Sequence, residues 1–266
     1  MKAQYYSKGC CYMVHQTAVI DKSAVIEENV EIGPYVIIGP ETVVKSGTKI
    51  HGQSVIEYSE IGSNCEIFNF AAIGKRPQDL KYYGEKTKVI VGDGTTIREC
   101  VTLNRGTAAA GQTIVGKNCL IMSCAHIAHD CTIGDGAIIG YSTGLAGHVE
   151  IGNSAILSAS IGVHQFCKIG NFAMVAAGAM VSMDIIPYVT AHGDRATLVG
   201  LNLMGLKRKK IELSEIEDIK MAYRTLFMSK LTLEDAIIKL GDLTSPYIKD
   251  ITTFVRNSQR GIARPK

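Results

Sequence analysis

The sequence of 266 residues contains no tryptophan, and aromatic residues make up only 6% of it. It also lacks a strong charge of one sign, since 28 basic residues stand against 25 acidic ones, so we expect no nucleic acid partner. No run of apolar residues approaches the length of a membrane-spanning helix. A core must therefore come from aliphatic and small residues, which favours β structure with closely spaced backbones over a helical bundle.

Aliphatic side chains recur at every sixth residue. The series runs from Val14 to Ile56 and, after a slip of one residue, from Ile61 to Val181. A period of six fits neither the turn of an α-helix nor the two-residue alternation of an ordinary strand. It is typical of a parallel β-helix, in which short strands and turns wind around an aliphatic core. We therefore predict a β-helix over residues 14–190.

The cysteines form no CxxC pair, and residues 1–13 contain no apolar segment typical of a signal peptide. These features predict free thiols and a cytoplasmic location. Residues 1–13 are predicted to be an N-terminal extension, with Met13 as an alternative start. Four cysteines precede an aliphatic position of the repeat by two residues, where small residues predominate, and are expected to be buried packing residues: Cys65, Cys119, Cys131 and Cys167.

Two stretches interrupt the repeat, and helices are predicted after it. Residues 74–90 are polar and charged, residues 104–114 are rich in Gly, Ala and Thr, and both are predicted to be loops that leave the coil and carry function. Residues 191–266 are predicted to form a small α-helical C-terminal domain. Its three helix starts are expected at Ser214 with Glu217, at Thr232 with Asp235 before a stop at Gly241, and at Ser245 with Pro246.

The period brings histidines together. Three six-residue units make one triangular coil, so residues eighteen apart are expected to stack at about 4.8 Å. Ile127, Leu145 and Val163 are spaced in this way, and Gly147 falls directly over His129. We therefore expect four histidines to line one edge of three successive coils: His126, His129, His148 and His164.

Three interpretations of this edge remain open. The histidines can occupy turn positions by coincidence, or three imidazoles can hold Zn²⁺. We favour acid–base chemistry, because a histidine titrates near neutral pH and can take a proton from a hydroxyl or amine nucleophile. Asp130 is positioned in the sequence to orient the imidazole of His129, and a bare glycine N–H above it can stabilise an oxyanion. Residues 140–144 (GYSTG) have the G-x-S-x-G spacing, but they lie inside the six-residue repeat rather than at a strand-to-helix turn, so we favour direct transfer without a covalent enzyme intermediate.

Several segments resemble the acyl-[acyl-carrier-protein]–UDP-N-acetylglucosamine O-acyltransferases, the enzymes that open lipid A synthesis. The resemblance runs from about Val14 to Gly261. It rests on segments 78–85 (QDLKYYGE), 125–131 (AHIAHDC), 145–149 (LAGHV), 163–167 (VHQFC) and 202–208 (NLMGLKR). It implies a left-handed parallel β-helix, a cytoplasmic homotrimer with active sites between subunits, and no cofactor or metal.

The resemblance also implies substrates and residue roles. The donor would be a (3R)-3-hydroxyacyl thioester on acyl carrier protein, and the acceptor a UDP-GlcNAc-type sugar. His129 would be the general base, Asp130 its partner and Gly147 the oxyanion donor. The residues that would bind or orient substrate are Gln78, Asp79, Lys81, His126, His148, His164, Gln165, Asn202 and Arg208. The basic run 207–210 also suits an acidic carrier protein or a diphosphate.

Two positions depart from the family pattern. Met204 stands where relatives carry an acidic residue beside the nucleotide, and Ala176-Ala177 replaces a small glycine pair in the region that limits acyl length. The sugar acceptor can be a 3-hydroxyl or a 3-amino group. Rival functions are a zinc-dependent enzyme of the γ-carbonic anhydrase type, a non-catalytic solenoid, and a sister acyltransferase that usually brings an N-terminal uridine-binding domain.

Overall fold

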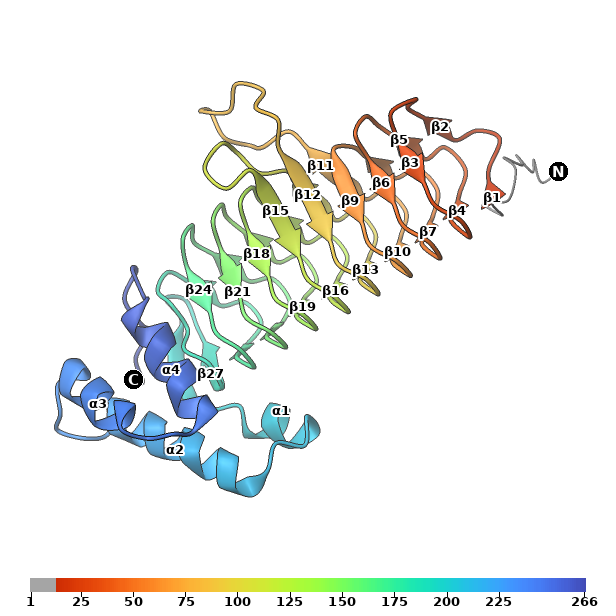
Figure 1. Ribbon diagram of the computed structural model, residues 1–266. Helices are drawn as coiled ribbons and strands as arrows, with labels where there is room; N and C mark the ends of the chain where they lie inside the picture. The colour runs from red at the N-terminus through yellow and green to blue at the C-terminus, as the bar shows by residue number, and fades with distance from the viewer. Residues whose placement is uncertain (1–12) are drawn as a thin grey trace.

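The computed structural model describes residues 13–266, so the predicted N-terminal extension lies, apart from Met13, outside the described residues. From Met13 the chain winds as a straight parallel β-helix, and helices cover its C-terminal end (Figure 1). Strands of two to five residues alternate with turns, and up to β26 every third strand joins the same sheet. The parallel β-helix predicted from the six-residue period is confirmed.

The three sheets form the faces of the coil within residues 13–266. The first sheet contains β1 (Met13–Val14), β4 (Glu31–Ile32), β7 (Lys49–Ile50), β10 (Glu66–Ile67), β13 (Thr96–Ile97), β16 (Leu120–Ile121), β19 (Ile138–Ile139), β22 (Ile156–Leu157), β25 (Met174–Val175), β27 (Val189–His192) and β28 (Thr197–Leu201). The β27–β28 pair is antiparallel, and it continues this sheet beyond residue 190.

The second sheet carries the histidine edge. It contains β2 (Val19–Ile20), β5 (Ile37–Ile38), β8 (Val55–Ile56), β11 (Ala72–Lys75), β14 (Thr102–Asn104), β17 (His126–Ile127), β20 (Gly144–Leu145), β23 (Gly162–Val163) and β26 (Met180–Val181). The third contains β3 (Val25–Ile26), β6 (Val43–Val44), β9 (Ser59–Ile61), β12 (Lys88–Val91), β15 (Gln112–Val115), β18 (Thr132–Ile133), β21 (Glu150–Ile151) and β24 (Lys168–Ile169).

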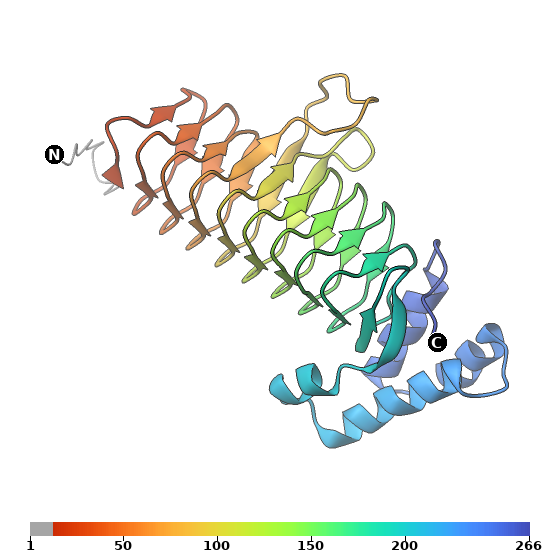
Figure 2. The same cartoon turned by 180° about the vertical axis from the view of Figure 1, so that it is seen from behind.

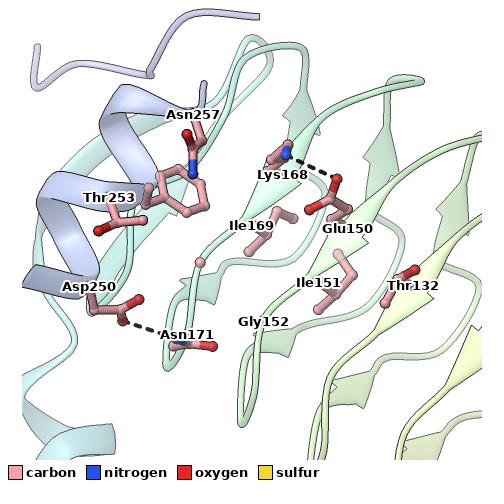
Figure 3. Close-up of a pocket in the computed structure, with 12 residues that line it drawn as sticks. Thr132, Glu150, Ile151, Gly152, Lys168, Ile169, Asn171, Asp250, Thr253 and Asn257 are labelled. Carbon is pink, nitrogen blue, oxygen red and sulfur yellow. Dashed lines mark hydrogen bonds and ion pairs between the residues drawn. The ribbon is translucent and has the colours of Figure 1, made fainter. Parts of the chain in front are cut away.

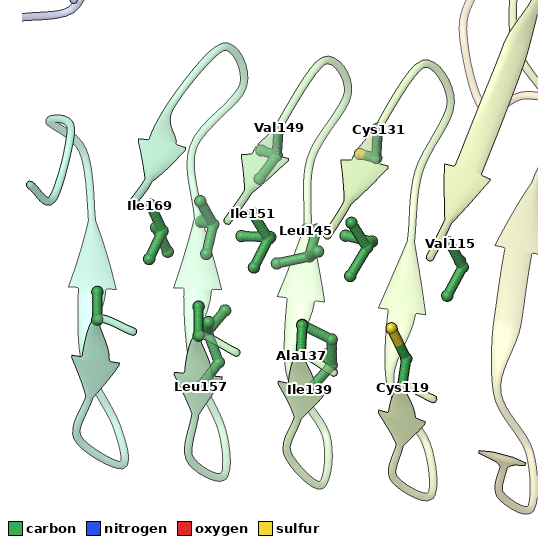
Figure 4. Packing of buried hydrophobic residues seen from close by; sticks show 14 of the residues in the cluster. Val115, Cys119, Cys131, Ala137, Ile139, Leu145, Val149, Ile151, Leu157 and Ile169 are labelled. Carbon is green, nitrogen blue, oxygen red and sulfur yellow. The ribbon is translucent and has the colours of Figure 1, made fainter. Parts of the chain in front are cut away.

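The core is a stack of aliphatic side chains from all three sheets (Figure 4). Ile127 pairs with Leu145 and Leu145 with Val163, as the eighteen-residue spacing predicts, and all three are buried. Each fully buried side chain of this size contributes roughly 1.5–3 kcal/mol. The four predicted packing cysteines are buried and free. Burial raises the pKa of the Cys131 thiol to about 12, so this sulfur is no nucleophile at neutral pH.

Four helices follow the strands, one more than predicted. They are α1 (Leu203–Arg208), α2 (Leu213–Phe227), α3 (Leu233–Gly241) and α4 (Pro246–Arg256). The predicted starts at Thr232 and Ser245 are confirmed. The predicted start at Ser214 is wrong, because the pair Glu212 and Glu215 has the same spacing two residues earlier. The Glu215 carboxylate accepts from the Glu212 N–H, so the helix already begins at Leu213.

Polar contacts join α4 to the last coils. The Asp250 carboxylate accepts hydrogen bonds from the Tyr188 hydroxyl (2.5 Å) and the Asn171 side-chain amide (3.0 Å). A pocket of about 280 Å³ lies between α4 and the third sheet, and Figure 3 shows the Asn171–Asp250 bond at its edge. Across residues 13–266, none of the helices has the length and apolar character needed to cross a bilayer.

Candidate active site

The candidate site lies at the corner between the second and third sheets. His126 belongs to β17, and its register partners in the next two coils are Gly144 and Gly162. The turns that follow β17, β20 and β23 stack at this corner and carry His129, His148 and His164. The two loops that interrupt the repeat, between β11 and β12 and between β14 and β15, project from the β-helix on one side (Figure 2).

Asp130 is the most enclosed polar group of the site. Its φ of 60° places it in the left-handed region, which aspartate tolerates better than most residues, and its side chain has no exposed surface. The Asp130 Oδ2 atom accepts from His129 Nδ1 at 2.8 Å and from the Thr107 hydroxyl at 2.7 Å. The Asp130 Oδ1 atom accepts from the Thr107 N–H at 2.8 Å. The carboxylate is thus held by one imidazole and one threonine.

The carboxyl of Asp130 is ionised. Burial opposes its charge, but the hydrogen bonds from the Thr107 hydroxyl, His129 and the Thr107 N–H outweigh burial and hold its pKa below the ordinary value. An ionised carboxylate accepts hydrogen bonds and donates none. His129 Nδ1 therefore carries the proton of this bond, and its Nε2 atom is left free to accept a proton.

Gly147 lies against the imidazole of His129. A Cβ atom at Gly147 would stand 2.6 Å from His129 Cε1 and 2.8 Å from Nε2, so no side chain fits here. The His148 N–H donates to the His129 carbonyl, which joins the two turns. Among the described residues the Gly147 N–H has no hydrogen-bond acceptor. It remains available to an oxyanion that forms beside His129.

The other three histidines lie around His129 and Gly147. The ring of His148 packs edge-on against His129 and stacks on Phe166 with centroids 4.5 Å apart. His126 Nδ1 bonds the Thr102 hydroxyl at 2.7 Å. Burial, and to a lesser extent the neighbouring His129, lowers the pKa of His126. His164 Nδ1 bonds the carbonyl of Gln165 at 3.0 Å.

A cavity of about 740 Å³ opens in front of His129. Its walls contain six of the residues that the sequence singled out: Gln78, His126, His129, Gly147, His164 and Gln165. Met180, Ser182, Asp194 and Arg195 also line it and were not foreseen, because they follow or end the repeat where the period gives no further guidance. The cavity is large enough for a small-molecule substrate.

Other residues singled out from the sequence lie outside the walls of this cavity. Asp130 lies behind His129, and His148 contacts His129 from the next turn. The Asp79 carboxylate accepts from the Lys81 N–H within the first loop. Asn202 caps α1, where its Oδ1 atom accepts from the Gly205 N–H, and Arg208 is exposed at the end of that helix. Ala176 and Ala177 lie in the turn after β25, on the first sheet.

A partly buried arginine, Arg105, anchors the two loops to each other. Arg105 donates to the Gly74 carbonyl at 2.8 Å and to the Tyr82 hydroxyl at 3.0 Å, and its guanidinium lies over the Tyr58 ring. Arg105 and Thr107 were both missed by the sequence reasoning. The sequence signal that could have identified them is their position in the second interruption of the repeat, one coil before Asp130.

His129, Asp130 and His148 could together hold a metal ion, since one donor atom from each lies within 4.8 Å of the others. The zinc alternative is based on three imidazoles, whereas this set contains two imidazoles and one carboxylate, which zinc also accepts as ligands. The Asp130 carboxylate, however, already accepts three hydrogen bonds, and His129 donates one of them. The arrangement therefore suits proton transfer by His129 better than metal coordination.

The repeat and the site define a class of protein, the hexapeptide-repeat transferases. Residues 112–147 match the family model of the bacterial transferase hexapeptide (six repeats), and residues 9–114 match that of the GMPPB C-terminal domain. Residues 184–263 match the model of UDP N-acetylglucosamine O-acyltransferase, domain 2.

Relatives and solved structures narrow the class. An acyl-[acyl-carrier-protein]–UDP-N-acetylglucosamine O-acyltransferase from Myxococcus xanthus is 45% identical over 77% of this chain and 80% of its own. A relative of the same description from Herminiimonas arsenicoxydans is 43% identical over 76% and 80%. The UDP-N-acetylglucosamine acyltransferase structure from Bacteroides fragilis matches with a TM-score of 0.92 and 44% identity, covering 95% of this chain and 100% of its own.

The chain belongs to the acyl-[acyl-carrier-protein]–UDP-N-acetylglucosamine O-acyltransferase family. A structure from Francisella novicida agrees, with a TM-score of 0.92 at 37% identity over 95% of this chain and 94% of that one. The left-handed parallel β-helix with a small helical C-terminal part, as predicted from the resemblance, is confirmed by these matches.

Proposed function

We propose that this protein transfers a (3R)-3-hydroxyacyl group from acyl carrier protein to the 3-position of UDP-GlcNAc or its 3-amino analogue, the first step of lipid A synthesis. The observation that carries the proposal is the pairing of His129 with Asp130 beside the free N–H of Gly147, in a cavity of about 740 Å³. Family membership supports both substrates.

The geometry supports direct transfer. His129 Nε2 takes the proton of the sugar 3-hydroxyl as its oxygen attacks the thioester carbonyl, and Asp130 stabilises the resulting imidazolium. The Gly147 N–H donates to the oxyanion of the tetrahedral intermediate. When the intermediate collapses, the carbon–sulfur bond breaks and the carrier thiolate receives the proton from His129. A 3-amino acceptor would follow the same path.

The remaining site residues divide between the cavity wall and its surroundings. Gln78, His126, His164 and Gln165 line the wall and would contact substrate directly. Roles in substrate binding are likewise proposed for Asp79, Lys81, His148, Asn202 and Arg208. The exposed basic run 207–210 would meet the acidic carrier protein or the diphosphate. Ala176 and Ala177 would set the accepted acyl length.

We also propose a homotrimer with its sites between subunits, acting in the cytoplasm. An outward-facing apolar row on the first sheet supports it, formed by Leu120, Ile138, Ile156 and Met174, with Met122 and Tyr141 exposed beside it. Sedimentation equilibrium would give three times the 28.7 kDa chain mass. A monomer at micromolar concentration would contradict this assembly.

The deciding experiment is an acyl-transfer assay with 3-hydroxyacyl carrier proteins of several lengths, against UDP-GlcNAc and its 3-amino analogue. We expect transfer to one acceptor by the wild-type protein, and a loss of about 10²- to 10⁴-fold in His129→Ala, the usual contribution of a general base. Absence of transfer to either sugar would refute the function. Full activity in His129→Ala would refute the base alone.

The compact set of His129, Asp130 and His148 keeps the zinc enzyme as a second candidate. Elemental analysis of the purified protein distinguishes the two. Stoichiometric zinc, with activity lost on chelation and restored by zinc, would favour the zinc enzyme. Transfer activity that is unchanged after exhaustive chelation would exclude it.

A further inference from the structure

Thr107 makes two of the three hydrogen bonds that hold the Asp130 carboxylate. Its N–H donates to Oδ1 at 2.8 Å and its hydroxyl donates to Oδ2 at 2.7 Å, so both oxygens are fixed by one residue. The side chain of Asp130 has no exposed surface, and Thr107 is itself buried. Water therefore cannot replace these donors without a rearrangement of the loop.

The carboxylate lies between two imidazoles. His129 Nδ1 is 2.8 Å from Oδ2, and His148 Nε2 is 3.7 Å from the same atom. A small rotation of the Asp130 carboxylate would replace its hydrogen bond with His129 by one with His148. The two outcomes differ chemically, because only a bond to His129 Nδ1 leaves Nε2 of that ring unprotonated beside Gly147.

We propose that Thr107 is a positioning residue that commits Asp130 to His129 rather than to His148, and thereby fixes the tautomer of the general base. The inference rests on the proposed function, because it takes His129 to be the general base of the acyl transfer. Thr107 acts through Asp130 and lies outside the walls of the cavity.

The loop that carries Thr107 is built to hold it. Its hydroxyl accepts from the Ala109 N–H at 3.2 Å, so the hydroxyl proton is directed at Asp130. Its carbonyl accepts from the Gly111 N–H at 2.7 Å, which closes the loop into a turn. Arg105 anchors the start of this loop through its bonds to Gly74 and Tyr82. The loop that forms the second interruption of the repeat thus holds Thr107 in place against the Asp130 carboxylate.

The test compares Thr107→Val, which loses the hydroxyl and keeps the shape and the backbone N–H, with Thr107→Ser, which keeps the hydroxyl. We expect Thr107→Val to lower kcat about 10- to 100-fold, the size of loss that follows removal of the hydrogen-bond partner orienting a metal-bound histidine. The KM values for both substrates should change little, and Thr107→Ser should restore most of kcat. Equal kcat in wild type and Thr107→Val would overturn the proposal, as would equal losses in the valine and serine variants.

A double-mutant cycle separates positioning from a general structural role. In the Asp130→Asn background the carboxylate is absent, so Thr107→Val should cause no further loss of kcat. Additive losses would show that Thr107 acts independently of Asp130 and would overturn the proposal. Thr95→Val is the matched control, because Thr95 is also a buried threonine that bonds a neighbouring turn, at a corner remote from the histidines. Its kcat should equal that of the wild type.

A spectroscopic measurement is independent of turnover. The His129 Nδ1–H proton, bonded to a buried carboxylate, should give a downfield proton resonance that disappears in His129→Ala. We expect it to be weakened or lost in Thr107→Val and retained in Thr107→Ser. An unchanged resonance in Thr107→Val would refute the positioning role even if the wild-type protein transferred no acyl group. Failure of the proposed function and failure of this inference are therefore distinguishable.

Discussion

At the scale of single residues, the site depends on one carboxylate and one glycine. The carboxylate already accepts three hydrogen bonds, and the glycine leaves no room for a side chain. Asp130 accepts from His129 and twice from Thr107, and Gly147 touches the imidazole of His129. Both features restrict where the imidazole can lie. The chemistry therefore depends on geometry set by small distances, and two substitutions test this directly.

Gly147→Ala should lower kcat on the order of 100-fold, because the new Cβ would stand 2.6 Å from His129 Cε1 and would displace the ring. The fold should persist, since the change lies at an open cavity. Steady-state kinetics alongside circular dichroism would check both expectations. Gly241→Ala in α3, where the new Cβ would meet no atom closer than 3.6 Å, is the control. Wild-type kcat in Gly147→Ala would contradict the close approach.

The depressed pKa of Asp130 makes a stability prediction with a definite sign. Since its pKa is lower in the folded than in the unfolded protein, ionised Asp130 stabilises the fold above the ordinary carboxyl value of about 3.9, and this contribution is lost as the pH falls below it. Asp130→Asn should therefore reduce the free energy of unfolding at pH 6 and converge on the wild type in acid. Urea titrations across this range would measure the difference, and a constant gap would contradict it.

At the scale of elements, the two loops are ordered parts of the scaffold. The first projects exposed side chains, with Leu80 100% and Tyr83 90% exposed, yet its base is held by Arg105 and Tyr82. Arg76 adds a bond to the Tyr82 carbonyl. This anchoring places Gln78 at the cavity wall while the tip of the loop remains free to meet a large donor such as a carrier protein.

Arg105→Lys should loosen the loops, because an ammonium cannot reproduce the fork of bonds to Gly74 and Tyr82 or the stacking on Tyr58. We expect faster chymotryptic cleavage at the exposed Leu80 and Tyr83, together with a lower kcat/KM. Limited proteolysis followed by mass spectrometry would locate the cuts. Arg98→Lys, which alters a half-exposed pair with Glu99, is the matched control and should cleave at the wild-type rate.

At the scale of the whole molecule, a shared apolar core and a set of polar contacts join the β-helix to the C-terminal helices. Asp250 on α4 accepts from Tyr188 and Asn171, and the buried Asp184 carboxylate accepts from Ser258 and from the Lys168 N–H. Burial and the Asp250 charge raise the pKa of the Tyr188 phenol, which therefore remains a donor. The helices close the open end of the aliphatic stack.

Tyr188→Phe should lower the free energy of unfolding by roughly 1–3 kcal/mol, because it leaves Asp250 without its closest donor in a partly buried place. Denaturant melts monitored by fluorescence and circular dichroism would measure the change. Tyr35→Phe, at a 63% exposed side chain in the N-terminal coils, is the control and should have little effect. A loss as small as that of the control would contradict the role of this contact.

The sequence alone determined the architecture and most of the histidine edge. Each coil repeats the same geometry, so a period of six sets the register of the strands, and the period by itself places Gly147 over His129. The starts of α3 and α4 were equally local, because a cap depends on neighbouring residues. The handedness came from the family resemblance, since the period is the same for either hand.

The tertiary structure alone decided what lies where the period stops. Helix α2 begins at Leu213 instead of the predicted Ser214 region, because two capping pairs with equal spacing compete. Helix α1 lies outside the repeat, so the six-residue period gives no signal for it. Thr107 meets Asp130 across a loop whose path depends on contacts such as those of Arg105, which no periodicity encodes. Repetition makes the strands predictable, whereas a segment outside the repeat lies where its own contacts place it, and the partner of the carboxylate is such a segment.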